Sequence, residues 1–322
     1  MIDNHALESV FARGMEHLSW LDTIHGPLDT PKVETIEKAC ELIWNRKGKR
    51  LRCHFVYWFG EAYGINPKDL ELYAWAVEAI HTATMLHDDV IDRAEMRRGG
   101  PSSNLVFDNT IPILSGDYLM SDAIYQLALK GHPELMRNMC SALKDLTQGE
   151  VIQYQNQFKV PDSDTLYHQI SDLKTASLLK WAASVGPTLK DSGDKISVIE
   201  FAKAFGLLFQ LTDDILDLKG THTKSKNQDL SEGKVNWATW QILQNEPQLK
   251  TRLKKEFESK TVTEESKTLL LGALNKPSNQ KALENCLLSV KNQCLMNLEN
   301  LESNSLCQLL THLVDFTTSR VY

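Results

Sequence analysis

The sequence predicts an all-α fold, and three observations support this prediction. Apolar residues recur every three or four positions over long segments, which is the spacing of a helix with one buried face. Alternating apolar and polar stretches are nearly absent, and the ten prolines fall mostly between the periodic segments. No low-complexity linker and no repeat of about 20–50 residues divides the chain. We therefore expect one domain over residues 1–322.

Proline and glycine mark the expected ends of the helices. A proline in a first helical turn costs nothing, because its missing N–H has no partner there. Three prolines open periodic segments in this way: Pro31, Pro67 and Pro133. Glycine is common just after a helix because it adopts positive φ without strain. Four glycines stand where segments stop and are expected to be such caps: Gly64, Gly131, Gly186 and Gly220.

Two segments are long enough to lie at the centre of a helical bundle. Residues 67–92 carry an apolar stripe that includes Leu70, Val77 and Ile80, and residues 192–218 carry another that includes Phe205 and Leu208. Long helices with few charges on one face are usually central in all-α proteins. The more polar part of the chain, from about residue 246 onward, is also expected to be helical.

Composition excludes several classes of protein. A net charge of −7 argues against a nucleic-acid surface. A hydrophobic content of 42% is enough for a sizeable core. No apolar run approaches the roughly 20 residues that span a bilayer. The first residues lack the basic and apolar regions of a signal peptide. The six cysteines show no Cys-x-x-Cys spacing, so we expect free thiols and a cytoplasmic protein.

Two copies of one acidic pentad stand out, one inside each long segment. They are Asp88-Asp89-Val90-Ile91-Asp92 and Asp213-Asp214-Ile215-Leu216-Asp217. On a helix the first and fifth residues lie about 40° apart around the axis, so each pentad presents carboxylates on one face. Apolar neighbours flank both pentads, and carboxylates among core residues need a partner.

Carboxylates converging from two helices would repel one another unless cations lay between them. An all-oxygen ligand set suits Mg²⁺, which keeps several waters and is often completed by substrate phosphates. We expect Asp88, Asp92 and Asp213 to contact the metal most directly. The other three carboxylates would complete the metal shells through water or substrate: Asp89, Asp214 and Asp217.

Two basic clusters contrast with the acidic net charge. One is Lys47-Gly48-Lys49-Arg50-Leu51-Arg52, and the other is Arg97-Arg98 just past the first pentad. Such runs are commonly solvated surface. However, Gly48 interrupts the first one where a backbone could approach an anion, and arginine offers a planar fork that matches phosphate oxygens.

Several motifs around the pentads occur in one order and carry a family resemblance. They are Gly48-Lys49-Arg50-Leu51-Arg52, the stretch from His81 to His87, Arg97-Arg98-Gly99, Gly149-Glu150, Lys174-Thr175-Ala176 and Phe209-Gln210. With the two pentads, they make the chain resemble the trans-prenyl diphosphate synthase (polyprenyl synthetase) family. The resemblance runs from about residue 48 to residue 234 and is loose beyond that.

The resemblance implies a single helical bundle of the isoprenoid synthase type with a central active-site cavity. It implies condensation of isopentenyl diphosphate with an allylic diphosphate, assisted by three Mg²⁺ ions, in a homodimer. Diphosphate departure would leave an allylic carbocation, which the double bond of isopentenyl diphosphate attacks. The departed diphosphate is the expected base for the final proton, since no side chain stands out for that role.

The resemblance also implies roles for individual residues. Four would hold the metal-free diphosphate of isopentenyl diphosphate: Lys49, Arg52, His81 and Arg98. Six would contact the metal-bound allylic diphosphate: Arg97, Lys174, Thr175, Gln210, Lys224 and Lys234. The stretch 224–234 resembles the family's mobile loop, which would close and exclude water from the carbocation.

Product length should depend on the helical face that leads away from the first pentad. Ala83 and Thr84 lie one turn before Asp88, and Ile80 lies deeper along the helix. Small residues at the first two positions would let a chain grow past short lengths, so we expect a long-chain product of the octaprenyl kind. Tyr125 and Trp75 are candidates for the floor. Small residues can also serve close helix packing alone.

Three other functions are compatible with parts of the pattern. A short-chain farnesyl or geranylgeranyl diphosphate synthase would share every motif. A non-catalytic partner subunit would be expected to lose acidic positions, yet all six are present. A terpene cyclase would ionise one diphosphate and would not need the second cradle at Lys49 and Arg52.

Overall fold

The computed structural model describes residue 11 and residues 17–24, 26–46, 48–97, 99–220 and 228–321. These residues form helices joined by short connections, with one two-residue antiparallel ladder between β1 (Met96–Arg97) and β2 (Gly100–Pro101). The prediction of an all-α fold is confirmed.

The first half of the chain contains the first long predicted helix. In order, its helices are η1 (Ser19–Thr23), α2 (Glu34–Trp44), α3 (Leu51–Ala62), α4 (Pro67–Ile91), α5 (Ser103–Phe107), α6 (Thr110–Lys130) and α7 (Pro133–Gln155). The second half begins with α8 (Thr165–Ile170), the π-helical turn η2 (Ser171–Ala176), α9 (Ser177–Leu189) and α10 (Lys195–Lys219). It continues with α11 (Gln228–Ser231), α12 (Trp237–Asn245), α13 (Pro247–Glu258), α14 (Glu264–Leu274), α15 (Pro277–Leu298) and α16 (Asn304–Ser319).

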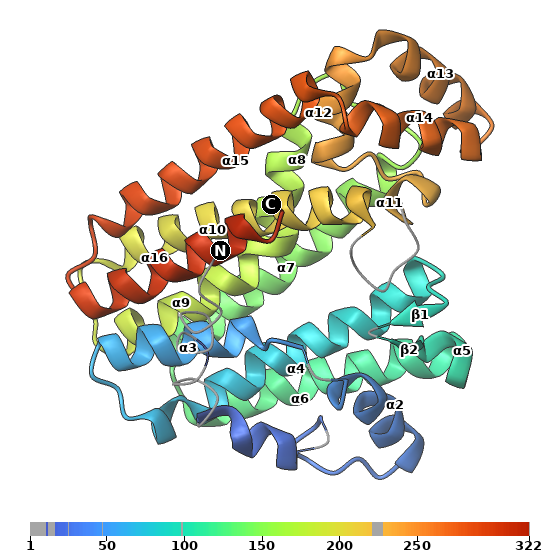
Figure 1. Cartoon of the computed structure of the whole chain (residues 1–322). Coiled ribbons are helices and arrows are strands. Elements are labelled where there is room, and N and C mark those ends of the chain that lie inside the picture. The colour runs from blue at the N-terminus through green and yellow to red at the C-terminus, as the bar shows by residue number, and fades with distance from the viewer. Residues whose placement is uncertain are drawn as a thin grey trace.

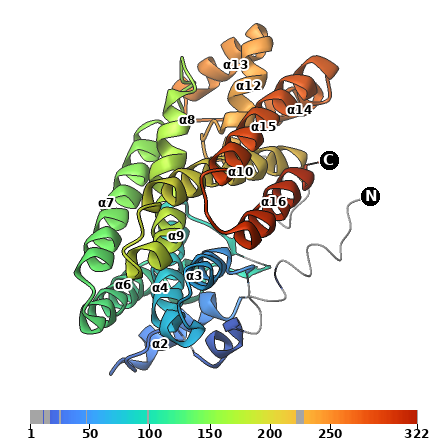
Figure 2. The same cartoon turned by 90° about the vertical axis from the view of Figure 1, so that its left-hand side faces the viewer.

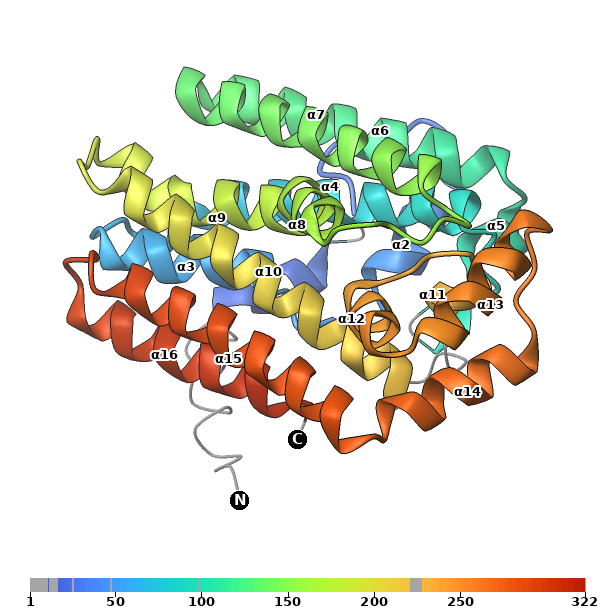
Figure 3. The same ribbon diagram turned by 90° about the horizontal axis from the view of Figure 1, so that it is seen from above.

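The long helices lie side by side in layers (Figure 1). Helix α4 packs between α6 and α3, α3 packs on α9, and α10 lies between α9 and α15. Seen from above, α6 and α7 form one side of the bundle and α15 and α16 form the other (Figure 3). The view in Figure 2 shows α12, α13 and α14 together at one end. Both pentads therefore lie on helices at the centre, as their apolar flanks predict.

Most of the predicted helix ends are confirmed, with two corrections. Pro67 and Pro133 begin α4 and α7, and Gly131 and Gly220 are left-handed C-caps. In contrast, α2 begins at Glu34, three residues after Pro31.

Gly186 does not end a helix but lies within α9. A Cβ atom there would be 2.5 Å from the backbone oxygen of Phe59, so this glycine serves the close approach of α9 to α3.

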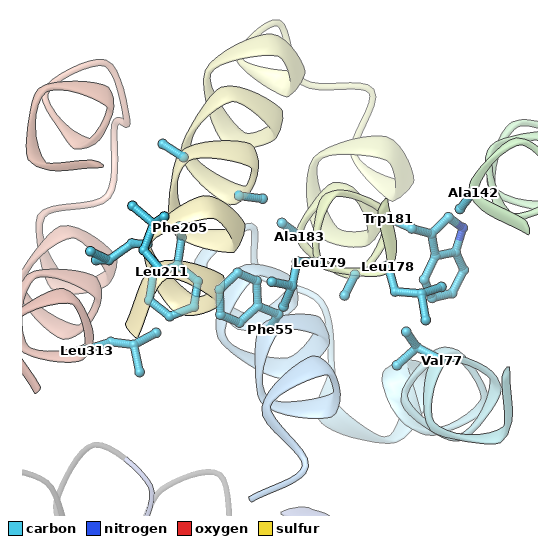
Figure 4. Close-up of a cluster of buried hydrophobic side chains, with 14 of the residues drawn as sticks. Phe55, Val77, Ala142, Leu178, Leu179, Trp181, Ala183, Phe205, Leu211 and Leu313 are labelled. Atoms are coloured by element: carbon cyan, nitrogen blue, oxygen red, sulfur yellow. The ribbon is translucent and has the colours of Figure 1, made fainter. Parts of the chain in front are cut away.

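The core is continuous along the bundle. Figure 4 shows Phe55 of α3 close to Phe205 of α10, with Leu313 of α16 nearby. On the other side of α9, Trp181 and Leu178 lie beside Val77 of α4 and Ala142 of α7. None of the described helices is both long and apolar enough to cross a membrane.

His54 of α3 is a buried titratable group inside this core. Its ring is 0% exposed and stacks on Trp58 with centroids 5.0 Å apart. Among the described residues, neither ring nitrogen has a hydrogen-bond partner. Burial, with a contribution from Arg50, lowers the pKa of His54 to about 4. The folded protein therefore holds this imidazole neutral.

We expect His54 to make the protein sensitive to acid. Because its folded pKa lies below the unfolded value of about 6.5, the unfolded state binds more protons and stability falls as pH drops from about 6.5 to 4. The loss is of the order of 3 kcal/mol. Chemical denaturation at several pH values should show it, and His54→Phe should flatten that part of the profile. An unchanged pH dependence in the variant would contradict this account.

Candidate active site

The first pentad lies at the C-terminal end of α4. Asp88 is in its last turn and Asp92 is its C-cap residue. Both line one cavity, called here the carboxylate cavity, together with Asp214, Arg97, Lys174 and Lys234. Burial raises the pKa of Asp88; Lys174 opposes this shift, whereas Glu150 and Asp92 add to it. A cation placed there would relieve this unfavourable environment.

Asp89 faces away from that cavity. Its carboxylate is 0% exposed and accepts hydrogen bonds from Arg97 Nε (2.6 Å), Ser103 N (3.1 Å) and Ser103 Oγ (3.0 Å). It thereby ties α4 to the β1–β2 hairpin and to α5. Arg97, which lines the carboxylate cavity, is held there through Asp89 and through its backbone oxygen, which accepts from Arg46 at 2.9 Å.

The carboxylates of the second pentad, on α10, lie in different surroundings. Asp214 is buried and lines the carboxylate cavity, where it accepts from Gln210 Nε2 (2.8 Å) and Trp237 N (2.9 Å). Burial raises the pKa of Asp214 well above its usual value, Asp229 adds to the shift, and the two hydrogen bonds oppose it. Asp213 instead pairs with Arg320 at 3.0 Å. Among the described residues, Asp217 is not part of the lining of these cavities.

Lys174 is placed by a π-helical turn. η2 widens the helix between α8 and α9 and carries both Lys174 and Thr175; such turns frequently occur at functional sites. The ammonium of Lys174 pairs with Glu150 and donates a hydrogen bond to Gln153 Oε1 at 2.9 Å. Its distance to Asp88 Oδ2 is 4.0 Å. Burial would lower the pKa of Lys174, but Asp88 and Glu150 hold it above its usual value.

Gly149 of α7 lies against this π-helical turn, next to Glu150. A Cβ atom at Gly149 would lie 3.0 Å from the Leu173 side chain and 3.1 Å from Lys174 N. The glycine therefore lets α7 approach η2 closely enough for Glu150 to meet Lys174. Sequence analysis noted the Gly149-Glu150 motif but assigned Glu150 no role, because its partner is distant in the sequence.

A second cavity, called here the basic cavity, lies on the other side of Gln210. Its lining includes Lys49, Arg50, Arg52, His81, Asp213, Phe316 and Arg320. Burial lowers the pKa of Lys49, nearby Arg320 adds to this, and Asp213 opposes it. Lys49 Nζ also lies 4.5 Å from the centroid of the Phe316 ring. A cavity with several cationic side chains suits an anion, because charged donors form strong hydrogen bonds with anionic oxygens.

Arg320 was not assigned by sequence analysis. It lies at the end of α16, and only the tertiary structure brings it to Asp213 and the basic cavity. The sequence signal was a single arginine near the C-terminus, which is not distinctive.

A third cavity, called here the apolar cavity, extends between α4, α6, α7 and α9. It is lined by Thr84, Met120, Leu143, Leu146 and Leu178, with Asp88 and Lys174 at one end. The structure thus brings Thr84 to the expected path of a growing chain. Ala83 and Ile80 are fully buried and are not in this lining. The backbone oxygen of Ala83 lies close to α6, since a Cβ on Gly116 would be 3.1 Å from it.

Neither residue suggested for the floor occupies that position. Tyr125 is 54% exposed on α6, and Trp75 donates its indole N–H to Gly26 O at 2.8 Å, away from the cavity. The next layer beyond Leu178 contains Trp181 with Val77 and Ala142 (Figure 4). The Trp181 indole is fixed by a 3.0 Å hydrogen bond to Leu135 O.

Thr175 lies where the three cavities meet, since it lines all of them. Its hydroxyl donates to Gln210 Oε1 at 2.7 Å, and Gln210 in turn donates to Asp214. This chain of hydrogen bonds links η2 to α10 and α12. It fixes the orientation of the Gln210 amide between the carboxylate and basic cavities.

Lys234 crosses to the first pentad from the segment after α11. Its ammonium lies 2.7 Å from Asp92 Oδ1 and 2.8 Å from Glu232 Oε2. Burial would lower the pKa of Lys234, but Asp92 and Glu232 raise it. Arg98 and Lys224, two further residues with expected roles, lie outside the described residues.

The donor set of the carboxylate cavity suits Mg²⁺. Within the described part of the chain, no three His, Cys, Asp or Glu side chains are grouped closely enough to ligate one ion. Mg²⁺ usually keeps several waters and is bound by one or two carboxylates together with substrate phosphates. The half-buried carboxylate of Asp88 and the buried carboxylate of Asp214 would provide hard oxygen ligands for it, and a bound cation would offset the burial that raises their pKa values.

Comparison with known proteins adds independent evidence. The family model described as polyprenyl synthetase matches residues 33–274. Decaprenyl-diphosphate synthase of Dictyostelium discoideum is 34% identical over 278 residues, which are 83% of this chain and 59% of that protein. Chloroplastic solanesyl diphosphate synthase 1 of Arabidopsis thaliana is 31% identical over 80% of this chain and 66% of that protein. The chain thus spans about three fifths to two thirds of the length of these two relatives.

Solved structures show the same fold. Decaprenyl diphosphate synthase from Rhodobacter capsulatus superposes with a TM-score of 0.87 at 25% identity, covering 98% of both chains. Polyprenyl synthase from Caulobacter crescentus CB15, solved with calcium and isoprenyl diphosphate, superposes with a TM-score of 0.88 at 24% identity, covering 99% of this chain and 98% of that one. The expected isoprenoid synthase bundle is confirmed. From the family match and these likenesses, we conclude that the chain belongs to the polyprenyl synthetase family.

Proposed function

We propose that this protein is a long-chain trans-prenyl diphosphate synthase, which condenses isopentenyl diphosphate with an allylic diphosphate. The observation that carries the proposal is the junction at Thr175, where a carboxylate, a basic and an apolar cavity meet. One cavity suits a metal-bound diphosphate, the second a metal-free diphosphate and the third a hydrocarbon chain. The names of the decaprenyl and solanesyl synthases among its relatives support a long product.

In the carboxylate cavity, Asp88 and Asp92 would hold Mg²⁺, with Asp214 of α10 in the same lining. When bound, Mg²⁺ would supply positive charge to the departing diphosphate, a term that is larger in the transition state than in the ground state. Lys174 and Lys234 are partly buried beside the first pentad and would bind the diphosphate oxygens directly. The proposal includes three bound Mg²⁺ ions, as the family resemblance implies.

In the basic cavity, Lys49, Arg52 and His81 would bind the diphosphate of isopentenyl diphosphate. The Gln210 amide and Thr175 hydroxyl lie between the two diphosphate sites and would orient both substrates. Holding the two reactants in contact is worth several kcal/mol of the barrier, because it removes the entropy of a bimolecular encounter.

The proposal includes a homodimer in a reducing compartment such as the cytoplasm. Exposed apolar side chains gather on α6 and α7: Ile113, Leu114, Tyr125, Leu129, Val151 and Tyr154. A face of this kind often marks a protein interface, and light scattering would measure the mass. All six cysteines are free thiols, which supports a reducing compartment.

The decisive assay mixes purified protein, Mg²⁺ and labelled isopentenyl diphosphate with a panel of allylic diphosphates, and resolves the products by length. We expect linear polyprenyl diphosphates that require both substrates and the metal. A cyclic product formed without isopentenyl diphosphate would identify a cyclase instead. No turnover with any primer would refute the proposal.

Thr84→Phe should shorten the product. A phenyl ring at this position would project into the apolar cavity, about one helical turn or 5.4 Å from Asp88. Chromatography of the product after hydrolysis to the alcohol would measure the change. Ala83→Phe is the matched control. Ala83 is fully buried and outside the lining of the apolar cavity, so this substitution should lower stability without shortening the product in the same way. An unchanged length in Thr84→Phe would place the growing chain elsewhere.

A further inference from the structure

Lys234 owes its position to a short backbone turn. Gly233 has φ of +75°, a conformation that favours glycine, and its N–H donates to Leu230 O at 3.0 Å. The N–H of Lys234 donates to Asp229 O at 2.8 Å. This turn ends the four-residue helix α11 and points the Lys234 side chain, which is 10% exposed, back to Asp92.

Phe158 closes on this turn from another part of the chain. Its N–H donates to Gly233 O at 2.7 Å. Its ring lies so close to Gly233 that an added Cβ would be 2.7 Å from three ring atoms. The Phe158 ring also packs edge-on against Phe257 of α13, with ring centroids 5.7 Å apart.

The backbone of Phe158 is itself unusual. Its φ of +56° is rare for an aromatic residue. Backbone conformations of this kind cost about 1–3 kcal/mol and persist only where the surroundings enforce them. Phe158 closely follows α7, whose Glu150 and Gln153 hold Lys174. One helix and the turn after it therefore hold both lysines that contact the first pentad.

We propose that Phe158 is a positioning residue that clamps Gly233 and so places Lys234 on the carboxylate cavity. The clamp consists of Phe158 and Gly233, and it rests on the proposed prenyl transfer for its functional meaning. Without the ring, the turn at Gly233 would keep one backbone hydrogen bond to residue 158 and lose its packing. Lys234 would then spend less time within reach of a diphosphate bound at Asp92.

A double-mutant cycle tests the clamp. Phe158→Ala should lower kcat/KM for the allylic substrate about tenfold, leave KM for isopentenyl diphosphate within about twofold, and be largely rescued in Phe158→Leu. If Phe158 acts through Lys234, adding Phe158→Ala to Lys234→Ala should cost less than about twofold. Phe107→Ala, a partly buried phenylalanine of α5, is the size-matched control and should leave both KM values unchanged. Multiplying effects in the double variant would overturn the proposal.

Hydrogen exchange provides a second readout that does not depend on turnover. The amides of Gly233 and Lys234 should exchange faster in Phe158→Ala, but not in Phe158→Leu or Phe107→Ala. Unchanged exchange in Phe158→Ala would overturn the clamp even if activity fell. If the wild-type protein catalysed no prenyl transfer, the proposed function would be refuted. The exchange result would still decide whether Phe158 holds this turn.

Discussion

Asp88→Asn is expected to lower kcat for prenyl transfer by about a thousandfold, the size of effect seen when a group that stabilises transition-state charge is removed. Asp88 lines both the carboxylate and the apolar cavities, so it lies where a diphosphate would separate from its hydrocarbon chain. The amide keeps the shape of the side chain but loses the negative charge that would attract Mg²⁺. Single-turnover assays with labelled isopentenyl diphosphate would measure the loss at saturating metal.

Two control variants test whether the effect of Asp88→Asn comes from its place in the cavity or from the loss of any negative charge on α4. Asp69→Asn removes an exposed carboxylate from the first turn of the same helix and should leave kcat within about twofold. Asp89→Asn should act mainly through folding and through Arg97, because its oxygens bind Arg97 and Ser103. Near-normal kcat in Asp88→Asn would show that the metal is not held at the end of α4.

Lys174→Gln should have the second largest effect, on both catalysis and stability. Removing the ammonium leaves Glu150 with an unpaired and largely buried charge, which costs about 3 kcal/mol when one partner of a buried ion pair is lost. It also removes a cation from beside Asp88, so we expect kcat to fall by about a hundredfold or more. Urea unfolding and steady-state kinetics would measure the two effects.

The pH dependence of this loss has a definite sign. The pKa of Lys174 is raised in the folded state, so its contribution is complete below the unfolded value of about 10.4 and is lost only as pH rises above it. The stability difference between wild type and Lys174→Gln should therefore be constant from about pH 7 to 9 and shrink at higher pH.

Lys180→Gln is the matched control for Lys174→Gln. Lys180 lies on the next helix, α9, and pairs with Asp172 at 2.6 Å outside the lining of the three cavities. It should lose some stability and little activity. Equal losses of activity in the two variants would mean that Lys174 acts through folding alone.

Much of the fold was predictable because helices depend on local patterns. Apolar spacing located α4 and α10, and Pro67, Pro133, Gly131 and Gly220 marked their ends or those of neighbouring helices. The exception at Gly186 is instructive. A glycine that ends a helix and a glycine that lets two helices touch look the same in sequence, and only the 2.5 Å approach to Phe59 separates them.

The residue types of the candidate site were predictable from the sequence, but which of these residues line which cavity was not. Neighbours in one pentad face different surroundings, since a helix turns about 100° per residue. Asp88 therefore enters the cavity while Asp89 binds Arg97 and Ser103. The same rotation brings Thr84 into the lining of the apolar cavity and leaves the buried Ala83 outside it.

By itself, the sequence determined the helical class, the paired acidic pentads and the family, because these depend on the order and spacing of residues along the chain. Only the tertiary structure decided which carboxylates share a cavity, that three cavities meet at Thr175, that Arg320 lines the basic cavity, and that Phe158 packs on Gly233. The physical reason is that ion pairs and ring contacts act over a few ångströms between segments that are far apart in the chain. Their energies depend on packing geometry, which no local pattern records.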